Sequence, residues 1–198
     1  MEPVVVDLGC GNTASVMFAL ERLGARPRLS SARAAIAEAE RLILPGVAAA
    51  DFAMRRIREL ELAQALREFQ RPLLGLCLGQ QLLFDSSEEG DVACLGLIRG
   101  RVRKLEPAPK HPVPHMGWNR LRNRREDPLL DGIGDGVFVY FAHSYCCAPA
   151  ETALATAEYG GEFAAVVRRE NFCGCQFHPE RSSGAGARIL ANFLALPC

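Results

Sequence analysis

The stretch Pro72-Leu73-Leu74-Gly75-Leu76-Cys77-Leu78-Gly79-Gln80-Gln81-Leu82-Leu83-Phe84 joins a short apolar run to an amphipathic segment. Residues 72–76 predict a buried strand, and residues 78–84 follow the spacing of a helix. Cys77 lies at the junction, between Gly75 and Gly79. Because a strand that leads into a helix is the repeating unit of α/β folds, this stretch indicates a parallel sheet covered by helices.

The chain before this stretch alternates in the same way. Val4-Val5-Val6 and Leu42-Ile43-Leu44 are apolar runs that predict two further buried strands. One helix is expected between them, with Asn12 as its N-cap and Gly24 at its end. A second is expected over residues 51–70. This half of the chain therefore predicts a central sheet with helices on both faces.

The pattern changes after Gly90. Residues 97–103, 137–140 and 163–167 alternate between apolar and polar or small side chains, which predicts strands exposed on one face, as in antiparallel sheets. A final helix is expected over residues 185–196. Since no linker or repeat interrupts the chain, we expect one α/β domain over residues 1–198 with a mixed, mostly parallel sheet.

Composition narrows the function classes. The 198 residues are 49% hydrophobic and carry 23 basic and 23 acidic side chains, which suits a globular domain with a full core and lacks the basic footprint of a nucleic-acid-binding protein. No apolar run is long enough to cross a bilayer, and residues 1–7 do not resemble a secretory signal. We therefore expect a cytoplasmic protein that binds neither nucleic acid nor a membrane.

The eight cysteines do not indicate a disulfide framework or a metal site. A chain of this length has no need of disulfides, and Cys146-Cys147 and Cys173-Gly174-Cys175 lack the spacing of zinc ligands. We expect most of the cysteines to be small buried hydrophobic residues, and no metal.

Cys77 is the exception. Small residues two positions before and after a nucleophile permit the sharp strand-to-helix turn that exposes it at the end of a sheet. The N-terminus of the following helix favours the thiolate form of such a cysteine. Cys77 is therefore a candidate nucleophile.

A candidate base lies about 100 residues further along, in Gln176-Phe177-His178-Pro179-Glu180. Pro179 keeps His178 out of helical geometry, and in extended backbone His178 and Glu180 project to the same side. Glu180 can then orient the imidazole ring, which completes a thiol, base and carboxylate arrangement. Candidate oxyanion donors are the backbone N–H of Leu78 and the strand end that contains Gly46 and Val47.

Three motifs together resemble class I glutamine amidotransferases. They are Leu44-Pro45-Gly46, Gly75-Leu76-Cys77-Leu78-Gly79-Gln80-Gln81 and Gln176-Phe177-His178-Pro179-Glu180. Within that class, three further stretches resemble the glutaminase subunits of imidazole glycerol phosphate synthases, enzymes of histidine biosynthesis. They are Asp7-Leu8-Gly9-x-Gly11-Asn12, Pro114-His115-Met116-Gly117-Trp118-Asn119 and Tyr140-Phe141-Ala142-His143-Ser144-Tyr145.

The resemblance implies a flavodoxin-like domain that forms a heterodimer with a cyclase subunit, a (βα)₈ barrel. L-glutamine is hydrolysed without a cofactor, and the ammonia passes to the cyclase, which makes imidazole glycerol phosphate and an aminoimidazole carboxamide ribotide. The motif positions assign catalysis to Cys77, His178 and Glu180, and the oxyanion site to Gly46, Val47 and Leu78. They assign glutamine binding to Gln81, Glu89, His143, Ser144 and Tyr145, and the partner interface to Asn12, Trp118 and Arg181.

The chain departs from the family pattern in places. Ala48-Ala49-Ala50 replaces a glycine-containing segment, Arg181 replaces a common lysine, and Cys146-Cys147 replaces larger residues. Alternative interpretations are a glutaminase for pyridoxal phosphate, anthranilate or GMP synthesis, a regulatory subunit without catalysis, and a cysteine peptidase. The motif from His115 to Asn119 argues against the first, the complete Cys77, His178 and Glu180 set against the second, and Gln81 and Glu89 against the third.

Overall fold

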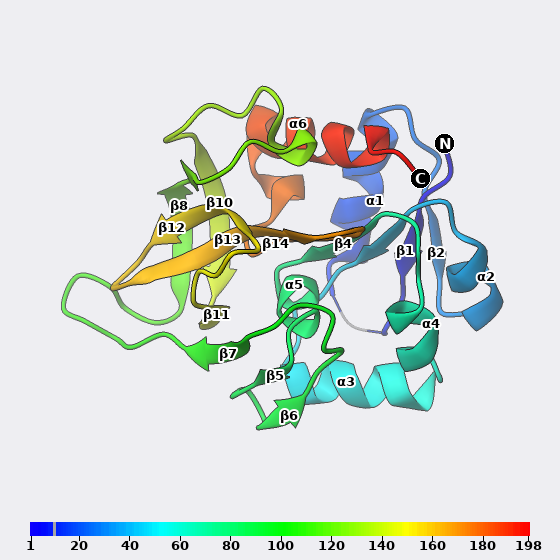
Figure 1. The fold of residues 1–198 in the computed structure, drawn as a ribbon, viewed down its shortest axis with the longest axis horizontal. Coiled ribbons are helices and arrows are strands. Elements are labelled where there is room, and N and C mark those ends of the chain that lie inside the picture. Colours follow the sequence, from blue (N-terminus) through cyan, green and yellow to red (C-terminus); the bar gives the residue numbers. More distant parts are fainter. Residues whose placement is uncertain (10) are drawn as a thin grey trace.

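An eight-stranded mixed sheet forms the centre of the molecule (Figure 1). The computed structural model describes residues 1–9 and 11–198. The strands of this sheet are β1 (Val4–Val6), β2 (Arg28–Ser30), β3 (Leu42–Leu44), β4 (Leu73–Leu76), β9 (Arg122–Asn123), β12 (Ala153–Glu158), β13 (Glu162–Arg169) and β14 (Phe172–Cys175). Their order is β2-β1-β3-β4-β14-β13-β12-β9, in which the first five strands are parallel and the last three antiparallel. The predicted mixed sheet is confirmed.

Helices cover both faces of this sheet, as the sequence predicts. One face carries α1 (Thr13–Arg22) and α6 (Ser183–Ala195), and the other carries α2 (Arg33–Glu38), α3 (Ala50–Glu59), α4 (Ala63–Arg67) and α5 (Leu78–Leu82) (Figure 1). Because successive strand residues face opposite sides, Val5 packs into the first core layer while Val4 and Val6 pack into the second. Asn12 caps α1 by accepting a hydrogen bond from the backbone N–H of Ser15, as expected.

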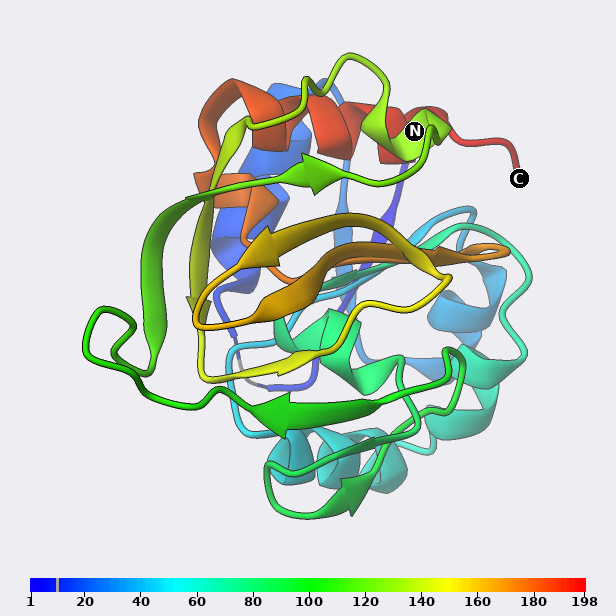
Figure 2. The ribbon, with the colours of Figure 1, turned by 60° about the vertical axis from the view of Figure 1, so that its left-hand side comes forward.

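Two small sheets stand beside the main one. A two-stranded ribbon pairs β8 (His115–Arg120) with β10 (Phe138–His143) and runs across the direction of β12 and β13 in Figure 2. A four-stranded sheet contains β5 (Ser86–Ser87), β6 (Val92–Ala93), β7 (Arg101–Lys104) and β11 (Tyr145–Cys147). Two short 3₁₀ turns, η1 (Pro128–Leu130) and η2 (Pro179–Arg181), complete the described elements.

The helix predicted over residues 51–70 is wrong in one respect, because the segment divides into α3 and α4. Glu61, at a φ of 56°, turns the chain between the two helices. The break follows from packing: α3 buries Met54 and Ile57, and one continuous helix would not bring Leu62 onto the same face. With the turn, Leu62 is fully buried.

The strand predicted over residues 97–103 is also shorter than expected, since β7 begins only at Arg101. Gly100 has a φ of 142°, and its N–H donates to a carboxylate oxygen of Asp85 at 2.9 Å. A Cβ at this position would lie 2.8 Å from Sγ of Cys147, so the chain turns sharply at a residue that must be glycine.

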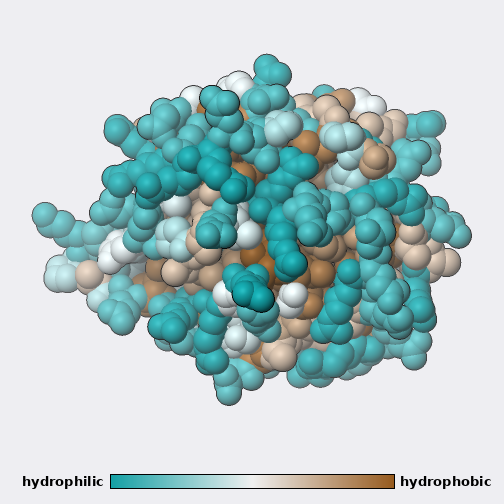
Figure 3. Space-filling view, viewed as in Figure 1, coloured by the Kyte–Doolittle hydropathy of each residue, from teal (hydrophilic) through white to brown (hydrophobic). Residues whose placement is uncertain are grey.

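The prediction that most of the cysteines are buried is confirmed. Cys77, Cys94, Cys147, Cys173 and Cys175 are buried, and all seven described cysteines are free thiols. Polar and charged residues cover most of the face seen in Figure 3, with apolar residues visible mainly towards its middle. Among the helices of the described residues, none is both long and apolar enough to cross a bilayer.

Candidate active site

Three neighbouring parallel strands bring the candidate residues to one edge of the sheet. The register pairs Leu44 of β3 with Gly75 of β4, and Gly75 with Gly174 of β14. Cys77 and His178 follow the ends of β4 and β14 and therefore meet. This is the crevice at the carboxyl ends of the strands where α/β sheets form their sites.

Cys77 occupies the strained turn that the sequence predicts. Its φ is 51°, in the left-handed region that non-glycine residues rarely adopt. A Cβ on Gly75 would lie 2.5 Å from the carbonyl oxygen of Gly79, and a Cβ on Gly79 only 1.7 Å from that of Leu44. Both glycines are therefore required for β4, the turn and α5 to pack this closely.

The Cys77 sulfur lies among polar groups although the residue is only 5% exposed. Its Sγ atom is 3.7 Å from the carbonyl oxygen of Ala142 and 3.8 Å from Nε2 of Gln176. The backbone N–H of Cys77 donates to the carbonyl of Cys175 at 2.7 Å, which fixes the turn against β14.

His178 and Glu180 form the expected pair, with Nδ1 of His178 2.9 Å from Oε1 of Glu180. The prediction that extended backbone brings these two residues together is wrong. His178 itself is extended, but Glu180 lies in the 3₁₀ turn η2, so the contact is made across a turn rather than along a strand. Ser182 holds this turn by donating from Oγ to the His178 carbonyl at 2.6 Å.

The charge state of His178 follows from these neighbours. Burial by itself lowers the pKa of His178, but hydrogen bonds to Cys77 and Glu180, together with the negative charges of both groups, raise it to about 10. The imidazole is therefore protonated at neutral pH and stands between two acidic partners.

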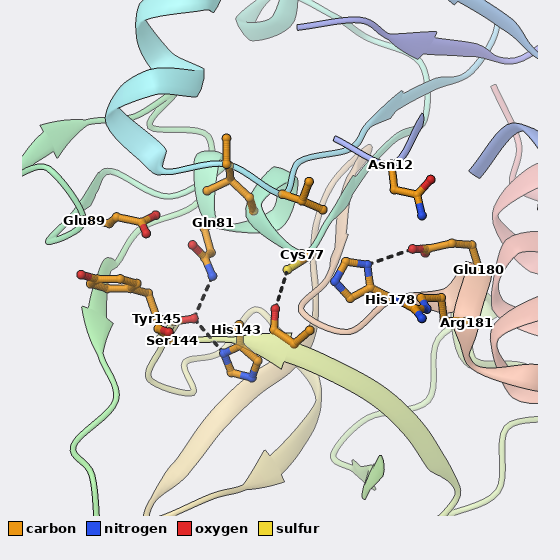
Figure 4. A pocket seen from close by; sticks show the side chains of 14 residues that line it. Asn12, Cys77, Gln81, Glu89, His143, Ser144, Tyr145, His178, Glu180 and Arg181 are labelled. Carbon is orange, nitrogen blue, oxygen red and sulfur yellow. Dashed lines mark hydrogen bonds and ion pairs between the residues drawn. The ribbon is translucent and has the colours of Figure 1, made fainter. Parts of the chain in front are cut away.

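A cavity of about 270 Å³ opens in front of Cys77 (Figure 4). It brings together most of the predicted site residues, with Ala48 and Ala142 in addition. Its lining contains Asn12, Val47, Ala48, Cys77, Leu78, Gln81, Glu89, Ala142, His143, Ser144, Tyr145, His178, Glu180 and Arg181. Of the residues predicted for the site, Gly46 lines a smaller adjoining cavity, and Trp118 lines neither.

Hydrogen-bond acceptors collect at the end of the cavity near Gln81 and Glu89. Nε2 of Gln81 donates to the Tyr145 carbonyl at 2.8 Å and to Oε1 of Gln176 at 3.1 Å, which leaves the Gln81 oxygen for a ligand. A carboxylate oxygen of Glu89 accepts from the N–H of Ala50 at 2.9 Å. Burial raises the pKa of Glu89, the Ala50 N–H opposes this rise, and Asp51 adds to it. This end of the cavity suits an ammonium group.

Behind His143 lies a second histidine, His115, to which the sequence analysis gave no role. Nδ1 of His143 must carry a proton because it bonds to the Tyr145 carbonyl at 2.9 Å, so its Nε2 accepts from Nδ1 of His115 at 3.0 Å. Burial lowers the pKa of His143 to about 3 and that of His115 to about 4. The pair is therefore neutral at neutral pH. The motif from Pro114 to Asn119 was the only signal for it.

The segments that follow β3 and β4 pack against each other beside Cys77. A Cβ on Gly46 would lie 2.9 Å from Cβ of Leu78, so the segment after β3 packs directly on the first turn of α5. The N–H of Leu78 is the first of that helix, and such groups have no partner within the helix. Val47 lines the cavity and is 54% exposed.

Trp118 lies on the exposed face of the β8–β10 ribbon. It is 50% exposed, and its ring centroid is 6.0 Å from that of Tyr140, the residue directly opposite on β10. The guanidinium of Arg181, which lines the cavity, lies 5.1 Å from the Tyr140 ring. Tyr140 thus connects the ribbon face with the rim of the cavity.

The family model and the most similar relatives reported below both indicate a glutamine amidotransferase. A family model described as glutamine amidotransferase class-I matches residues 4–196. The imidazole glycerol phosphate synthase subunit HisH of Xylella fastidiosa (strain Temecula1) is 51% identical over 195 residues, which cover 98% of each chain. The HisH subunit of Xanthomonas axonopodis pv. citri (strain 306) is 50% identical over 192 residues, or 97% of this chain and 96% of the relative.

Solved structures share the fold at lower sequence identity. A structure described as a glutamine amidotransferase superimposes with a TM-score of 0.75 at 20% identity and 96% coverage of both chains. The PurLQS structure from Thermotoga maritima gives a TM-score of 0.73 at 21% identity, covering 98% of this chain and 97% of that one. At these identities the match establishes the fold alone.

Proposed function

This chain belongs to the class I glutamine amidotransferase family and is an enzyme of that class, and we propose that it is the glutaminase subunit of an imidazole glycerol phosphate synthase. The HisH relatives, about half identical over nearly the whole chain, support this assignment. The observation that carries the chemistry is that Cys77 and His178 line the same cavity, and that Nδ1 of His178 lies 2.9 Å from Oε1 of Glu180.

In the proposed first step the Cys77 thiolate attacks the side-chain amide carbon of L-glutamine. The negative charge that develops on the amide oxygen is stabilised by the N–H of Leu78 and by an N–H of the segment around Gly46 and Val47. His178 gives its proton to the amide nitrogen, the carbon–nitrogen bond breaks, and ammonia leaves. The product on the enzyme is a glutamyl thioester at Cys77.

In the second step neutral His178 accepts a proton from water, which attacks the thioester. The carbon–sulfur bond breaks, glutamate is released, and the thiolate and imidazolium are restored. Glu180 holds the ring through Nδ1 in both steps, so the other ring nitrogen, Nε2, is the one that serves Cys77 and water. No step requires a metal or a cofactor.

We assign glutamine recognition to the acceptor end of the cavity. The free oxygen of Gln81 and the carboxylate of Glu89 are suited to the α-ammonium of glutamine. Tyr145 supplies the carbonyl that fixes Gln81, and His143 fixes that carbonyl from the other side. Ser144 lines the wall between them. The cavity holds only about 270 Å³, which favours an amino acid over an extended peptide.

We assign the partner interface to the surface around the cavity mouth. Asn12 and Arg181 line the cavity, and Trp118 is joined to that rim through Tyr140. Met116 and Phe138, which are 64% and 47% exposed, extend the apolar surface of the same ribbon. Large exposed apolar side chains of this kind mark interaction surfaces. The proposed partner is a cyclase subunit, a (βα)₈ barrel that forms a heterodimer with this chain and receives its ammonia.

We further propose that the isolated chain is nearly inactive. The segment after β3 carries one oxyanion donor, packs on Leu78 and is exposed at Val47, where a docked partner can contact it. Its continuation is held at Ala50 by Glu89. A single-domain organisation, a cytoplasmic location and the absence of a cofactor remain predictions.

Glutamate release from L-glutamine tests the proposal. The purified chain is assayed alone, with the cyclase subunit of an imidazole glycerol phosphate synthase, and with that subunit plus a ribulotide ligand. We expect strong stimulation only when both partner and ligand are present. High turnover by the chain alone would contradict the proposed activation. Unstimulated activity would indicate a different acceptor enzyme, and no activity from folded protein would favour a regulatory subunit.

A further inference from the structure

We propose that Gln176 donates a hydrogen bond from its side-chain amide to the Cys77 sulfur, and that Gln81 sets the orientation of this amide. The inference rests on the proposed role of Cys77 as nucleophile and adds a second donor, besides His178, that stabilises the thiolate. Gln176 is the first residue of the motif that contains His178 and Glu180, and no role was predicted for it from the sequence.

The backbone places Gln176 next to Cys77 without freedom to move away. Gln176 follows β14 directly and is fully buried. Its N–H donates to the carbonyl of Ala165 on β13, and the N–H of Cys77 donates to the carbonyl of Cys175. Both sides of the contact are therefore tied to the centre of the sheet, and the amide of Gln176 is held 3.8 Å from Sγ.

The hydrogen bonds decide which end of the amide faces the sulfur. The carbonyl oxygen of Tyr145 can only accept, so the atom of Gln81 that contacts it is the donor, Nε2. The same Nε2 also contacts the side chain of Gln176 at 3.1 Å, so the Gln176 atom there must be the oxygen. The amide nitrogen of Gln176 is then the end that faces Cys77.

This arrangement favours the charged form of the sulfur. A neutral thiol has an acceptor for its proton in the Ala142 carbonyl, 3.7 Å away. A thiolate instead accepts hydrogen bonds from His178 and from the Gln176 amide. Hydrogen bonds to charged groups are worth more than those to neutral ones, so Gln176 shifts the balance towards the thiolate. The other charged or titratable side chains that line the cavity with Cys77 and His178 are Glu89, His143, Tyr145, Glu180 and Arg181.

Two substitutions at position 176 separate the effect of the hydrogen bond to the sulfur from the effect of packing. Gln176→Leu removes the amide at similar volume. Gln176→Glu keeps the shape and an acceptor for Gln81, but it places an oxygen against the sulfur. The matched control is Gln80→Leu, because Gln80 is another fully buried glutamine, and its side-chain amide donates to the Ala164 carbonyl at 3.0 Å instead of to Cys77.

The experiment measures the rate at which iodoacetamide alkylates Cys77 between pH 5 and pH 10, followed by mass spectrometry of the peptide that contains this residue. Circular dichroism checks that each full-length variant is folded. We expect the midpoint of the rate profile to rise by about one pH unit or more in Gln176→Leu, and further in Gln176→Glu. Gln81→Met, which frees the Gln176 amide to rotate, should raise it by less. Gln80→Leu should leave it unchanged.

An unshifted midpoint in either folded Gln176 variant would overturn the inference, and so would an equal shift in Gln80→Leu. The readout does not depend on glutamine turnover. Failure of the proposed function, seen as undiminished glutamate release by Cys77→Ala, is therefore distinguishable from failure of this inference.

Discussion

His115 donates a hydrogen bond from Nδ1 to Nε2 of His143 at 3.0 Å, and both residues are buried, with His143 in the wall of the cavity and His115 behind it. His143 in turn holds the Tyr145 carbonyl to which Gln81 is bonded. His143 accepts this bond only while its ring is neutral, because protonation would remove the acceptor at Nε2. Protonation of His115 would instead remove the acceptor that faces Nδ2 of Asn119 at 3.4 Å. The position of Gln81, to which we assign glutamine binding, thus depends on two histidines that are neutral at neutral pH.

Acid should therefore destabilise the protein, because His115 and His143 bind protons more readily in the unfolded chain. Burial lowers the pKa of His115 to about 4 and that of His143 to about 3, so the unfolded chain binds protons more readily than the folded one below about pH 6.5. Stability should fall as pH decreases from there towards 4. His115→Gln removes one of the two groups, so urea unfolding of this variant should show a shallower fall. Identical slopes for wild type and variant would contradict the neutral pair.

The stability that His178 contributes should depend on pH in the opposite sense, and Glu180→Gln tests this. The pKa of His178 is raised to about 10 in the folded protein, against about 6.5 for a free side chain, so protonation of His178 stabilises the fold. This contribution is fully present below about pH 6.5 and is lost as pH rises through about 10. Because Glu180→Gln removes a negative charge from His178, we expect the difference in unfolding free energy between wild type and variant to shrink over this range. A difference that grows with pH would be incompatible with a protonated His178.

Gly186 and Gly184 offer a matched test of how α6 packs on the loop that carries His178. A Cβ on Gly186 would lie 1.9 Å from the Pro179 carbonyl oxygen, whereas a Cβ on Gly184 would meet nothing within 4 Å. We expect Gly186→Ala to lower the unfolding free energy by about 1–3 kcal/mol or more. Gly184→Ala should leave it unchanged or raise it by up to about 1 kcal/mol. Denaturant titration measures both, and equal effects would show that the close approach is not present.

Trp118→Ala should weaken binding of the cyclase subunit. A half-exposed tryptophan at the centre of an interface typically contributes about 2 kcal/mol or more, or roughly a 30-fold change in Kd. Stability of the isolated chain should change little, because Trp118 packs mainly against Tyr140 at the surface. The control is Leu29→Ala, an exposed apolar residue on β2 at the opposite edge of the sheet. Isothermal titration with the partner measures both, and comparable affinities for the two variants would argue against this interface.

Local steric rules made part of the site predictable from sequence. Gly75 and Gly79 flank Cys77 because the turn leaves no space for a side chain, and that requirement is visible in a short motif. The apolar runs of β1, β3 and β4 likewise predict buried parallel strands. In both cases the residues that determine the local structure lie within a few positions of it in the sequence.

Features that depend on long-range packing were not predictable in this way. Gln176, directly after β14, contacts Cys77 although the two are 99 residues apart in sequence, and Glu89 reaches Ala50 across 39 residues. The break at Glu61 arises because Leu62 has a place in the core that one straight helix cannot reach. The contact between His178 and Glu180 was predicted, but its path through the turn η2 was not.

The most direct test of the central claim compares two nitrogen sources in the reconstituted synthase. Wild-type chain and Cys77→Ala are each combined with the cyclase subunit, and formation of imidazole glycerol phosphate is measured with L-glutamine and, separately, with added ammonia. We expect Cys77→Ala to abolish the glutamine-dependent reaction and to retain the ammonia-dependent one at the wild-type rate. Glutamine-dependent synthesis by the variant, or loss of both reactions in a complex that still assembles, would contradict the role of Cys77 as a nucleophile that serves a separate synthase.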